Sequence, residues 1–209
     1  RNVLRMKPGE EISVSNGQDG REYRCGILSL EEDCIRCELR FIKEDGVELP
    51  SKIYLFQGLP KADKMELIIQ KAVELGVYQV IPVATKRCVV KLDDKKAKSK
   101  IARWQGIAEA AAKQSKRGII PQVNEVMSFR DAVRYAADMD VKLIPYELAE
   151  GMEQTKRLIE SVRSGQQIAI FIGPEGGFDP EEIRIATEAG IQPITLGKRI
   201  LRTETAGFT

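Results

Sequence analysis

The sequence contains no histidine, only one tryptophan and four cysteines among its 209 residues. Without histidine, no mechanism can use an imidazole as a base, as the partner of a nucleophile or as a metal ligand. The cysteines are too few and too irregularly spaced for a disulfide scaffold, and a zinc site at Cys34 and Cys37 would need two further ligands. We therefore expect no metal centre and interpret the cysteines as reduced, small apolar residues of a cytoplasmic protein.

Long apolar segments and a strong net charge are also missing. No stretch approaches the length of a membrane span, so we expect no membrane partner. The formal net charge is only +2, so total charge does not indicate a nucleic-acid partner and the distribution of charge has to be considered instead. The length suits one sizeable core, or a small domain together with a medium one.

Two kinds of pattern divide the chain near residue 48. Residues 1–48 contain short alternating stretches separated by glycine and asparagine or aspartate turn signals, which is typical of a small β-barrel or sandwich. From residue 49 onward, apolar strands alternate with amphipathic helices: a strand at Ile53–Phe56 is followed by a helix from Lys61 to Leu75. This order predicts a parallel α/β sheet.

The last third contains the most informative local sequence. An apolar strand is predicted over Gln167–Ile172, and it runs directly into a glycine-rich loop at 173–178. Asp179 is placed as the N-cap of the next helix, with Pro180 at its first position. A strand, glycine loop and capped helix place a ligand at the carboxyl end of a parallel sheet, although the loop alone is interpreted equally well as a tight turn without a ligand.

The glycine loop is neither a P-loop nor a dinucleotide-binding GxGxxG motif. Glu175 lies among its glycines and would repel a phosphate, so a neutral or cationic ligand with hydroxyl groups fits better than a nucleoside polyphosphate. A second glycine turn follows at Leu196 and Gly197, and the polar run Arg202-Thr203-Glu204-Thr205 comes shortly after it.

These two motifs, IGPEGGF (172–178) and LGKRILRTETA (196–206), closely resemble the cofactor-binding motifs of the uridine-N3 methyltransferases of 16S ribosomal RNA. That family belongs to the SPOUT superfamily of knotted enzymes that use S-adenosylmethionine (SAM). The resemblance continues through residues 86–91, 103–117 and 2–10, so it covers essentially the whole chain.

The resemblance implies an α/β fold in two domains. Residues 49–209 would form a SPOUT methyltransferase domain with a parallel sheet and a C-terminal trefoil knot, and residues 1–48 a PUA-like β-barrel RNA-binding domain. It further implies that the start of the first domain and the final helix of the second lie outside this sequence. The expected protein is a cytoplasmic homodimer that binds SAM without a metal and methylates 16S rRNA of the small ribosomal subunit.

The resemblance also implies roles for residues of the two motifs. Arg202 is expected to stabilise the anion that uracil becomes when N3 loses its proton, and Glu204 to accept that proton directly or through water. Glu204 is interpreted equally well as a residue that bonds backbone amides at a helix start. Glu147, at the end of a predicted strand, could reach a hydroxyl or amino group of the cofactor or could be a surface acid. The expected cofactor-binding residues are Glu147, Gly173, Glu175, Gly176, Gly177, Leu196, Gly197, Ile200, Leu201, Arg202, Thr203, Thr205 and Ala206.

Basic residues concentrate between residues 86 and 117, where eleven Lys and Arg stand against three Asp and Glu. Such a run is commonly a solvated helix face, but it also suits phosphate contacts with RNA. Trp104 falls at helical spacing with Ile107 and Ala108, which favours a core position over a base-stacking one. The expected RNA-binding residues are Arg5, Lys86, Arg87, Lys91, Arg103, Gln114 and Arg117.

Two other functions remain compatible with the sequence. One is a methyltransferase of the same superfamily that acts on transfer RNA, and the other is a non-catalytic RNA-binding or ribosome-assembly protein. The intact run from Arg202 to Thr205 argues against the second. A nucleotide-dependent oxidoreductase is disfavoured because the chain has no GxGxxG motif.

Overall fold

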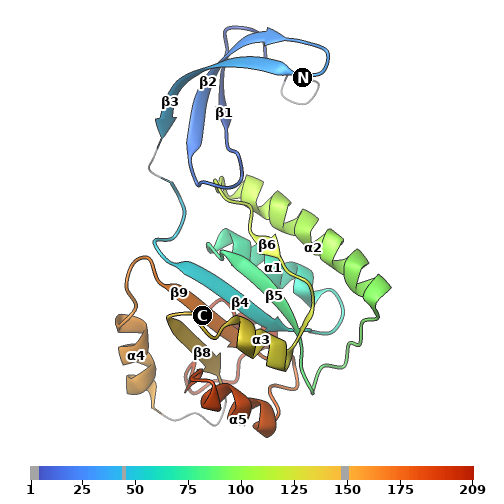
Figure 1. The fold of residues 1–209 in the computed structure, drawn as a ribbon, viewed down its shortest axis with the longest axis vertical. Coiled ribbons are helices and arrows are strands. Elements are labelled where there is room, and N and C mark those ends of the chain that lie inside the picture. Colours follow the sequence, from blue (N-terminus) through green and yellow to red (C-terminus); the bar gives the residue numbers. More distant parts are fainter. Residues whose placement is uncertain (1–4, 44–45, 147–150) are drawn as a thin grey trace. The chain divides into compact units, whose positions relative to one another are not determined.

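The computed structural model describes residues 5–43, 46–146 and 151–209. The chain divides into two compact units (Figure 1). Unit 1 consists of residues 1–48 and 112–120, and unit 2 of residues 49–111 and 121–209. Within the described ranges, no helix is both long enough and apolar enough to cross a membrane.

Unit 1 contains an antiparallel sheet in the order β1-β2-β3. Its strands are β1 (Glu11–Val14), β2 (Glu22–Leu30) and β3 (Ile35–Lys43), close to the predicted stretches. All of β3 is exposed, so the described residues form an open three-stranded sheet, and its closure into a barrel stays a prediction. Residues 112–120 also belong to this unit, which the sequence pattern did not indicate. A hydrogen bond from Ile120 N to Gly17 O at 3.1 Å attaches them to it.

Unit 2 is built on a parallel sheet in the order β10-β8-β9-β4-β5-β6, with β7 also paired to β5. The predicted parallel α/β fold is therefore confirmed. The strands are β4 (Lys52–Gly58), β5 (Gln79–Ala84), β6 (Gln122–Val123), β7 (Met127–Ser128), β8 (Val141–Pro145), β9 (Gln167–Ile172) and β10 (Gln192–Ile194). The short strands β6 and β7 were not predicted, because two residues carry no readable alternation.

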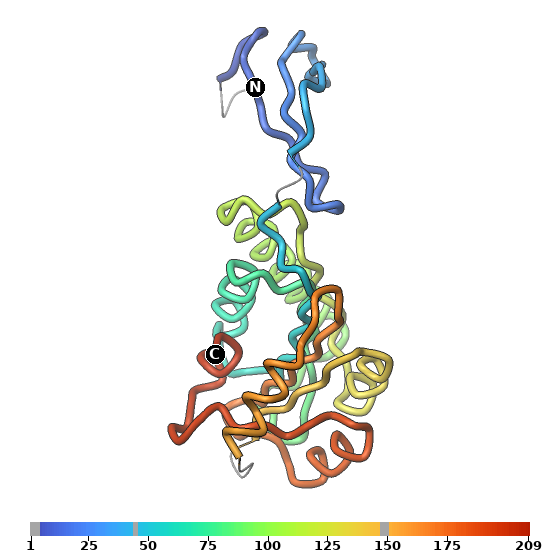
Figure 2. Tube along the Cα trace, turned by 90° about the vertical axis from the view of Figure 1, so that its left-hand side faces the viewer, coloured from blue at the N-terminus to red at the C-terminus, as the bar shows by residue number. Residues whose placement is uncertain are grey.

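Helices cover both faces of this sheet. Helices α1 and α6 lie on one face, and α3 and α5 on the other (Figure 1, Figure 2). The helices are α1 (Lys64–Glu74), α2 (Asp94–Gln114), α3 (Phe129–Tyr135), α4 (Met152–Glu160), α5 (Pro180–Glu188) and α6 (Thr203–Ala206). Because both faces are covered, the central strands must be apolar throughout, which explains their unbroken apolar runs.

The core of unit 2 lies where β4 and β9 pair. The rings of Phe56 and Phe171 stack with their centroids 4.3 Å apart, and both side chains are fully buried. Phe129 and Phe178 extend this aromatic cluster on the side of α3 and α5. The predicted core position of Trp104 is confirmed, since only 3% of its surface is exposed.

Two element boundaries have identifiable local causes, and the first differs from the prediction. Helix α1 begins at Lys64 and not at Lys61, because Ala62 adopts a left-handed conformation (φ 53°) that a helix cannot contain. Strand β10 ends at Ile194, because Gly197 has φ 108° and its N–H donates to the side chain of Thr195 in a turn.

Candidate active site

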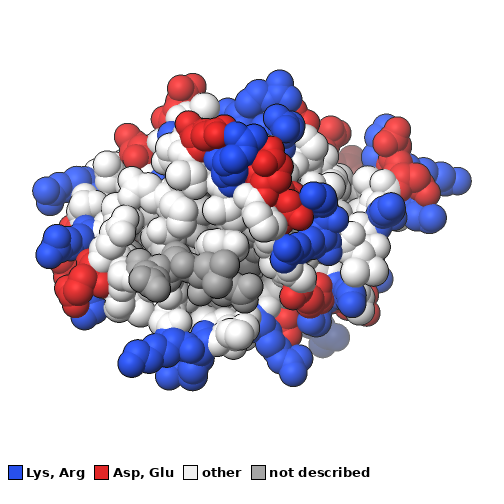
Figure 3. Space-filling view, turned by 90° about the horizontal axis from the view of Figure 1, so that it is seen from below, with Lys and Arg blue, Asp and Glu red and all other residues white. Residues whose placement is uncertain are grey.

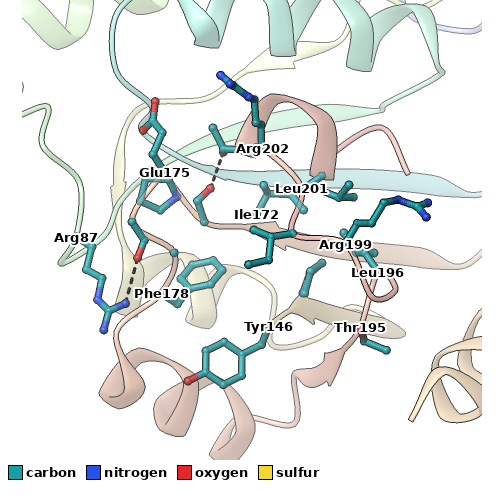
Figure 4. Close-up of a pocket in the computed structure, with 18 of the residues that line it drawn as sticks. Arg87, Tyr146, Ile172, Glu175, Phe178, Thr195, Leu196, Arg199, Leu201 and Arg202 are labelled. Atoms are coloured by element: carbon teal, nitrogen blue, oxygen red, sulfur yellow. Dashed lines mark hydrogen bonds between the residues drawn. The ribbon is translucent and has the colours of Figure 1, made fainter. Parts of the chain in front are cut away.

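A cavity of about 500 Å³ opens at the carboxyl ends of β8, β9 and β10. Its walls come from the loop 173–178 after β9, the loop 195–202 after β10 and the first turn of α6. This is the edge of a parallel sheet at which ligands usually bind. Figure 4 shows the rings of Tyr146 and Phe178 and the side chains of Ile172 and Leu196 around the cavity.

The glycine loop is shaped by backbone requirements at two positions. Gly177 has φ 65°, a conformation that other residues rarely adopt, and its N–H donates to Pro174 O at 2.8 Å. A Cβ on Gly173 would lie 3.1 Å from the Gly177 backbone, so the two ends of the loop approach closely. The predicted N-cap then starts α5: Asp179 accepts from Glu181 N, and Glu182 bonds back to Asp179 N.

The second loop is held on the opposite side of the cavity. Thr155 of α4 is buried, and its hydroxyl accepts a hydrogen bond from Thr195 N at 3.2 Å. Ile200, Leu201 and Arg202 line the cavity, and Ile200 is 88% exposed. Arg202 occupies the N-cap position of α6, and its carbonyl accepts from Thr205 N and Ala206 N.

One buried hydrogen-bond chain joins the two loops. The Thr203 hydroxyl donates to Gly173 O at 2.6 Å and accepts from Gln57 Nε2 at 3.0 Å. Gln57 is completely buried at the end of β4, so this link is shielded from water. The structure thus brings the two motifs together, although they are separated by some twenty residues in the sequence.

A charged cluster closes another side of the cavity. Lys64 Nζ lies 2.9 Å from Glu175 Oε1 and 3.4 Å from Glu204 Oε2. Burial opposes ionisation of Glu175, but hydrogen bonds from Lys64 and from backbone N–H groups outweigh it and lower the pKa of this carboxyl. The hydrogen bond to Glu175 in turn raises the pKa of Lys64.

Lys64 was missed by the sequence reasoning, although the chain contains one weak signal for it. A cation in the first turn of a helix is unfavourable to the helix dipole, so a lysine there is expected to have carboxylate partners from elsewhere. Which carboxylates these are depends on contacts across more than a hundred residues, and no local pattern identifies them.

Two of the expected RNA-binding residues lie against the glycine loop. Arg87 Nη1 donates to Gly176 O at 3.1 Å, the contact drawn in Figure 4. Lys86 Nζ lies 3.1 Å from Asp179 Oδ1, and Lys86 N donates to Glu182 Oε1 at 2.8 Å. Hydrogen bonds from Lys86 and from the Glu181 backbone lower the pKa of Asp179. The start of the basic run is therefore attached to the loop and to the first turn of α5.

The other expected RNA-binding residues are more dispersed. In unit 2, Lys91 is exposed and Arg103 pairs with Glu66 at 2.8 Å while staying largely exposed. Arg5 and Gln114 are exposed residues of unit 1. Basic and acidic side chains alternate around the rim of the face seen in Figure 3.

Arg117 has a structural role inside unit 1. Its side chain is 3% exposed, and its Nε and Nη2 donate to the carboxylate of Glu48 at 2.5–3.2 Å. Ile119 N donates to the same carboxylate at 3.2 Å. Because this guanidinium is buried in an ion pair, we leave Arg117 out of the RNA-binding surface proposed below.

Glu147, expected to reach the cofactor, lies outside the described residues. Thr205 is exposed on α6, while Gly197, Ile200 and Ala206 line the cavity. All four cysteines are free. Among the described residues, no three His, Cys, Asp or Glu side chains group in a way that could hold a metal ion.

Fold and site together define an α/β protein with a ligand cavity enclosed by two loops at the carboxyl edge of its parallel sheet. The chain belongs to the RNA methyltransferase domain family, whose sequence model matches residues 47–209. A second family, described as the RNA methyltransferase PUA domain, matches residues 1–39. The family resemblance inferred from the motifs is thereby confirmed.

Individual relatives agree with this assignment. The chain is 41% identical over 208 residues to ribosomal RNA small subunit methyltransferase E of Bacillus subtilis, covering 98% of this chain and 81% of the relative. It is similar to the crystal structure of ribosomal RNA small subunit methyltransferase E from Neisseria gonorrhoeae bound to SAM, with 36% identity, a TM-score of 0.80 and coverage of 99% and 82%. A putative methyltransferase from Legionella pneumophila in complex with SAM has 35% identity, a TM-score of 0.80 and coverage of 98% and 82%.

The residues around the cavity fit SAM, which combines an adenine, a ribose, a cationic sulfur and an amino-acid group. The cavity volume lies within the range of small-molecule sites. Apolar side chains such as Ile172 and Leu196 suit the adenine, and the backbone of the glycine loop offers polar groups to the hydroxyls. Glu204 Oε2 is buried near the cavity and lies 3.4 Å from Lys64 Nζ, so it places a carboxylate close to a ligand bound there.

Proposed function

We propose that the protein is a SAM-dependent methyltransferase that methylates N3 of a uridine in 16S rRNA of the small ribosomal subunit. One structural observation carries the proposal: the two family motifs enclose a single cavity that Arg202 lines, and Glu204 lies 3.4 Å from Lys64, which also lines it. The small-subunit rRNA methyltransferases among the relatives support the choice of RNA.

Three further features belong to the same proposal. The backbone around 173–178 and 196–206 forms a trefoil knot, an exception to normal chain connectivity. Residues 1–48 act as a PUA-like RNA-binding barrel, and residues 49–209 as the SPOUT catalytic domain. The protein works as a homodimer in the cytoplasm. Sedimentation that finds only monomers under conditions of full activity would contradict the dimer.

The chain would hold the cofactor mainly through backbone groups of the two loops. SAM would supply a methyl group bound to a positively charged sulfur. The rest of the molecule would leave as a neutral thioether, so the transfer needs no metal activation. The residues that would bind SAM are those expected from the motifs: Gly173, Glu175, Gly176, Gly177, Leu196, Gly197, Ile200, Leu201, Arg202, Thr203, Thr205 and Ala206. Apolar walls exclude water from the reacting atoms.

Arg202 is suited to act on the acceptor base. Its side chain is exposed and makes no ion pair with any described residue. In Figure 4 it extends away from the rings of Tyr146 and Phe178. A guanidinium beside the cavity stabilises the anion that forms at uracil when the N3–H bond breaks.

Glu204 is suited to accept the N3 proton. The alternative role, in which Glu204 bonds backbone amides at a helix start, stays open beside this one. One of the Glu204 carboxylate oxygens, Oε2, is buried and lies 3.4 Å from Lys64 Nζ. A carboxylate held beside Arg202 in this way can take a proton directly or through water.

RNA contact is proposed for Lys86, Arg87, Lys91, Arg103, Gln114 and Arg5. The first two support the proposal most directly, because Arg87 contacts the glycine loop, Lys86 contacts the start of α5, and both stay substantially exposed. Their pairing with Asp179 leaves room for a phosphate to compete for the same cations, since exposed ion pairs of this kind are worth little. Binding should therefore weaken as salt rises.

The decisive experiment incubates the protein with labelled SAM and small subunits that lack the modification, followed by mapping of the methylated base by mass spectrometry. Label at N3 of one 16S uridine is expected. If the label were found on transfer RNA instead, transfer RNA would be the substrate. Absence of any transfer while SAM binds would favour a non-catalytic RNA-binding protein.

Arg202→Ala tests the mechanism within this assay. SAM binding by calorimetry should be retained, while methyl transfer falls by a factor of about 10² to 10³, the usual loss for one electrostatic stabiliser. Arg184→Ala is the matched control, because Arg184 is an exposed arginine of α5 that pairs only with Glu181 and Glu188 in the described structure. Transfer by Arg202→Ala at the rate of this control would remove Arg202 from the mechanism.

A further inference from the structure

Lys64 links the two pocket-forming segments through a single ammonium group. Its Nζ lies 2.9 Å from Glu175 Oε1 on the glycine loop and 3.4 Å from Glu204 Oε2 on α6. Lys64 also lines the cavity itself. No motif assigns it a role, and it comes from a helix some hundred residues earlier in the chain.

The burial of this cluster distinguishes it from an ordinary surface ion pair. The side chains of Lys64, Glu175 and Glu204 are 31%, 26% and 18% exposed, so salt and water screen the cluster less than a fully exposed pair. By contrast, Lys71 and Glu74 on the same helix pair only with each other in the described structure. A cation at the start of α1 opposes the helix dipole, so its position is favourable only because of the carboxylates.

Glu175 also determines how α1 begins. Its two carboxylate oxygens accept from Lys61 N at 3.1 and 3.3 Å. Asp63, at the N-cap position, makes no side-chain capping bond, and Ala62 is held in a left-handed conformation. The turn before α1 is therefore organised by a carboxylate from the glycine loop, which couples Lys64 to that loop by two routes.

We propose that Lys64 is a positioning residue for methyl transfer, which holds Glu175 against α1 to keep the glycine loop closed and holds Glu204 beside Arg202. This inference rests on the proposed function. Without the ammonium group, two partly buried carboxylates would face the same space without a cation between them. The glycine loop and α6 would then separate, and Glu204 would move away from the reacting base.

The two partners predict two separable effects of removing the charge. Lys64→Met keeps an unbranched side chain of similar length and loses the ammonium group. Loss of the Glu175 contact should raise the Kd for SAM about three- to tenfold, and loss of the Glu204 contact should lower kcat at saturating SAM by a factor of about 10 to 100. Lys71→Met removes an equivalent lysine–glutamate pair from the same helix and should change neither quantity.

Double variants assign each effect to its partner. If Lys64 acts through Glu204, adding Lys64→Met to Glu204→Gln should leave kcat unchanged, because interacting residues give non-additive effects. Likewise, adding Lys64→Met to Glu175→Gln should not weaken SAM binding further. Multiplicative losses in both pairs would overturn the proposal, as would a Lys64→Met protein with wild-type kcat and Kd.

Two measurements keep the test decisive if a variant folds poorly or the proposed function fails. Lys64→Arg retains the cation and should keep kcat within about threefold of wild type, so a loss as large as that of Lys64→Met would overturn positioning by charge. If the wild-type protein methylates no RNA, the proposed function fails, and the proposal for Lys64 is judged by calorimetry of SAM alone. Unchanged affinity in Lys64→Met would then refute it.

Discussion

Gly58 is predicted to set the position of the glycine loop. It is the last residue of β4, and an added Cβ would lie 2.6 Å from Pro174 Cδ and 2.7 Å from Pro174 N. Both distances are far below the 3.4 Å of ordinary contact, so residue 58 and Pro174 would have to move apart by about 0.8 Å. Because β4 is paired on one side with β5 and on the other with β9, the loop must give way and not the strand.

The magnitude follows from the cost of inserting one methyl group into a packed site. Overpacking typically costs about 1–3 kcal/mol. If the displaced loop must return to bind SAM, affinity in Gly58→Ala should fall about fivefold to a hundredfold. Gly106→Ala is the matched control: Gly106 lies within α2 with no atom within 4 Å of an added Cβ, so alanine should leave SAM affinity unchanged and stabilise the helix by up to about 1 kcal/mol.

Isothermal calorimetry with SAM measures the affinity, and thermal unfolding reports the folded fraction of both variants. If Gly58→Ala bound SAM with wild-type affinity while folded, contact between β4 and Pro174 could not be what positions the loop. A loss equal in both glycine variants would also refute the reasoning.

Three further predictions concern other parts of the structure. Arg117→Leu should destabilise unit 1 by about 1–3 kcal/mol, because the partly buried carboxylate of Glu48 loses its cation and keeps the hydrogen bond from Ile119 N. Hydrogen exchange of β2 amides measures this loss, and unchanged protection would contradict it. Thr203→Val should weaken SAM binding by about 1–3 kcal/mol in calorimetry through loss of the hydroxyl that joins the two loops, and Thr203→Ser should restore it. The lowered pKa of Glu175 means that its ionised form stabilises the fold above the ordinary value of 4.5, and that this contribution is lost as pH falls below 4.5 through the lowered value. The unfolding free energy of Glu175→Gln should therefore fall less steeply with acid than that of the wild type, and parallel curves would exclude the effect.

Local sequence predicted the parts of the site that depend on short-range chemistry. The N-cap at Asp179 with Pro180 at the first helical position needs only adjacent residues, and the glycine loop follows directly from the strand before it. Each of these features is complete within about ten residues, so its pattern can be recognised without knowledge of the fold. The strand over Gln167–Ile172 was predicted with its correct bounds for the same reason.

Long-range contacts decided the features that the sequence pattern did not indicate. Gln57 links the two loops only because β4 lies next to β9 in the sheet, a pairing of strands more than a hundred residues apart. Arg117 was expected on an RNA-binding surface, but the fold buries it against Glu48 across 69 positions. In a basic run, one arginine is not distinguishable from its neighbours until its partner is known.

The sequence by itself determined that this protein is an α/β member of an RNA methyltransferase family with two motif loops near its carboxyl end. Only the tertiary structure decided that those loops enclose one cavity, that Lys64 joins them and that residues 112–120 complete the first unit. The physical reason is that strand and turn chemistry act over a few residues, whereas a cavity and its ion pairs exist only once distant strands have paired.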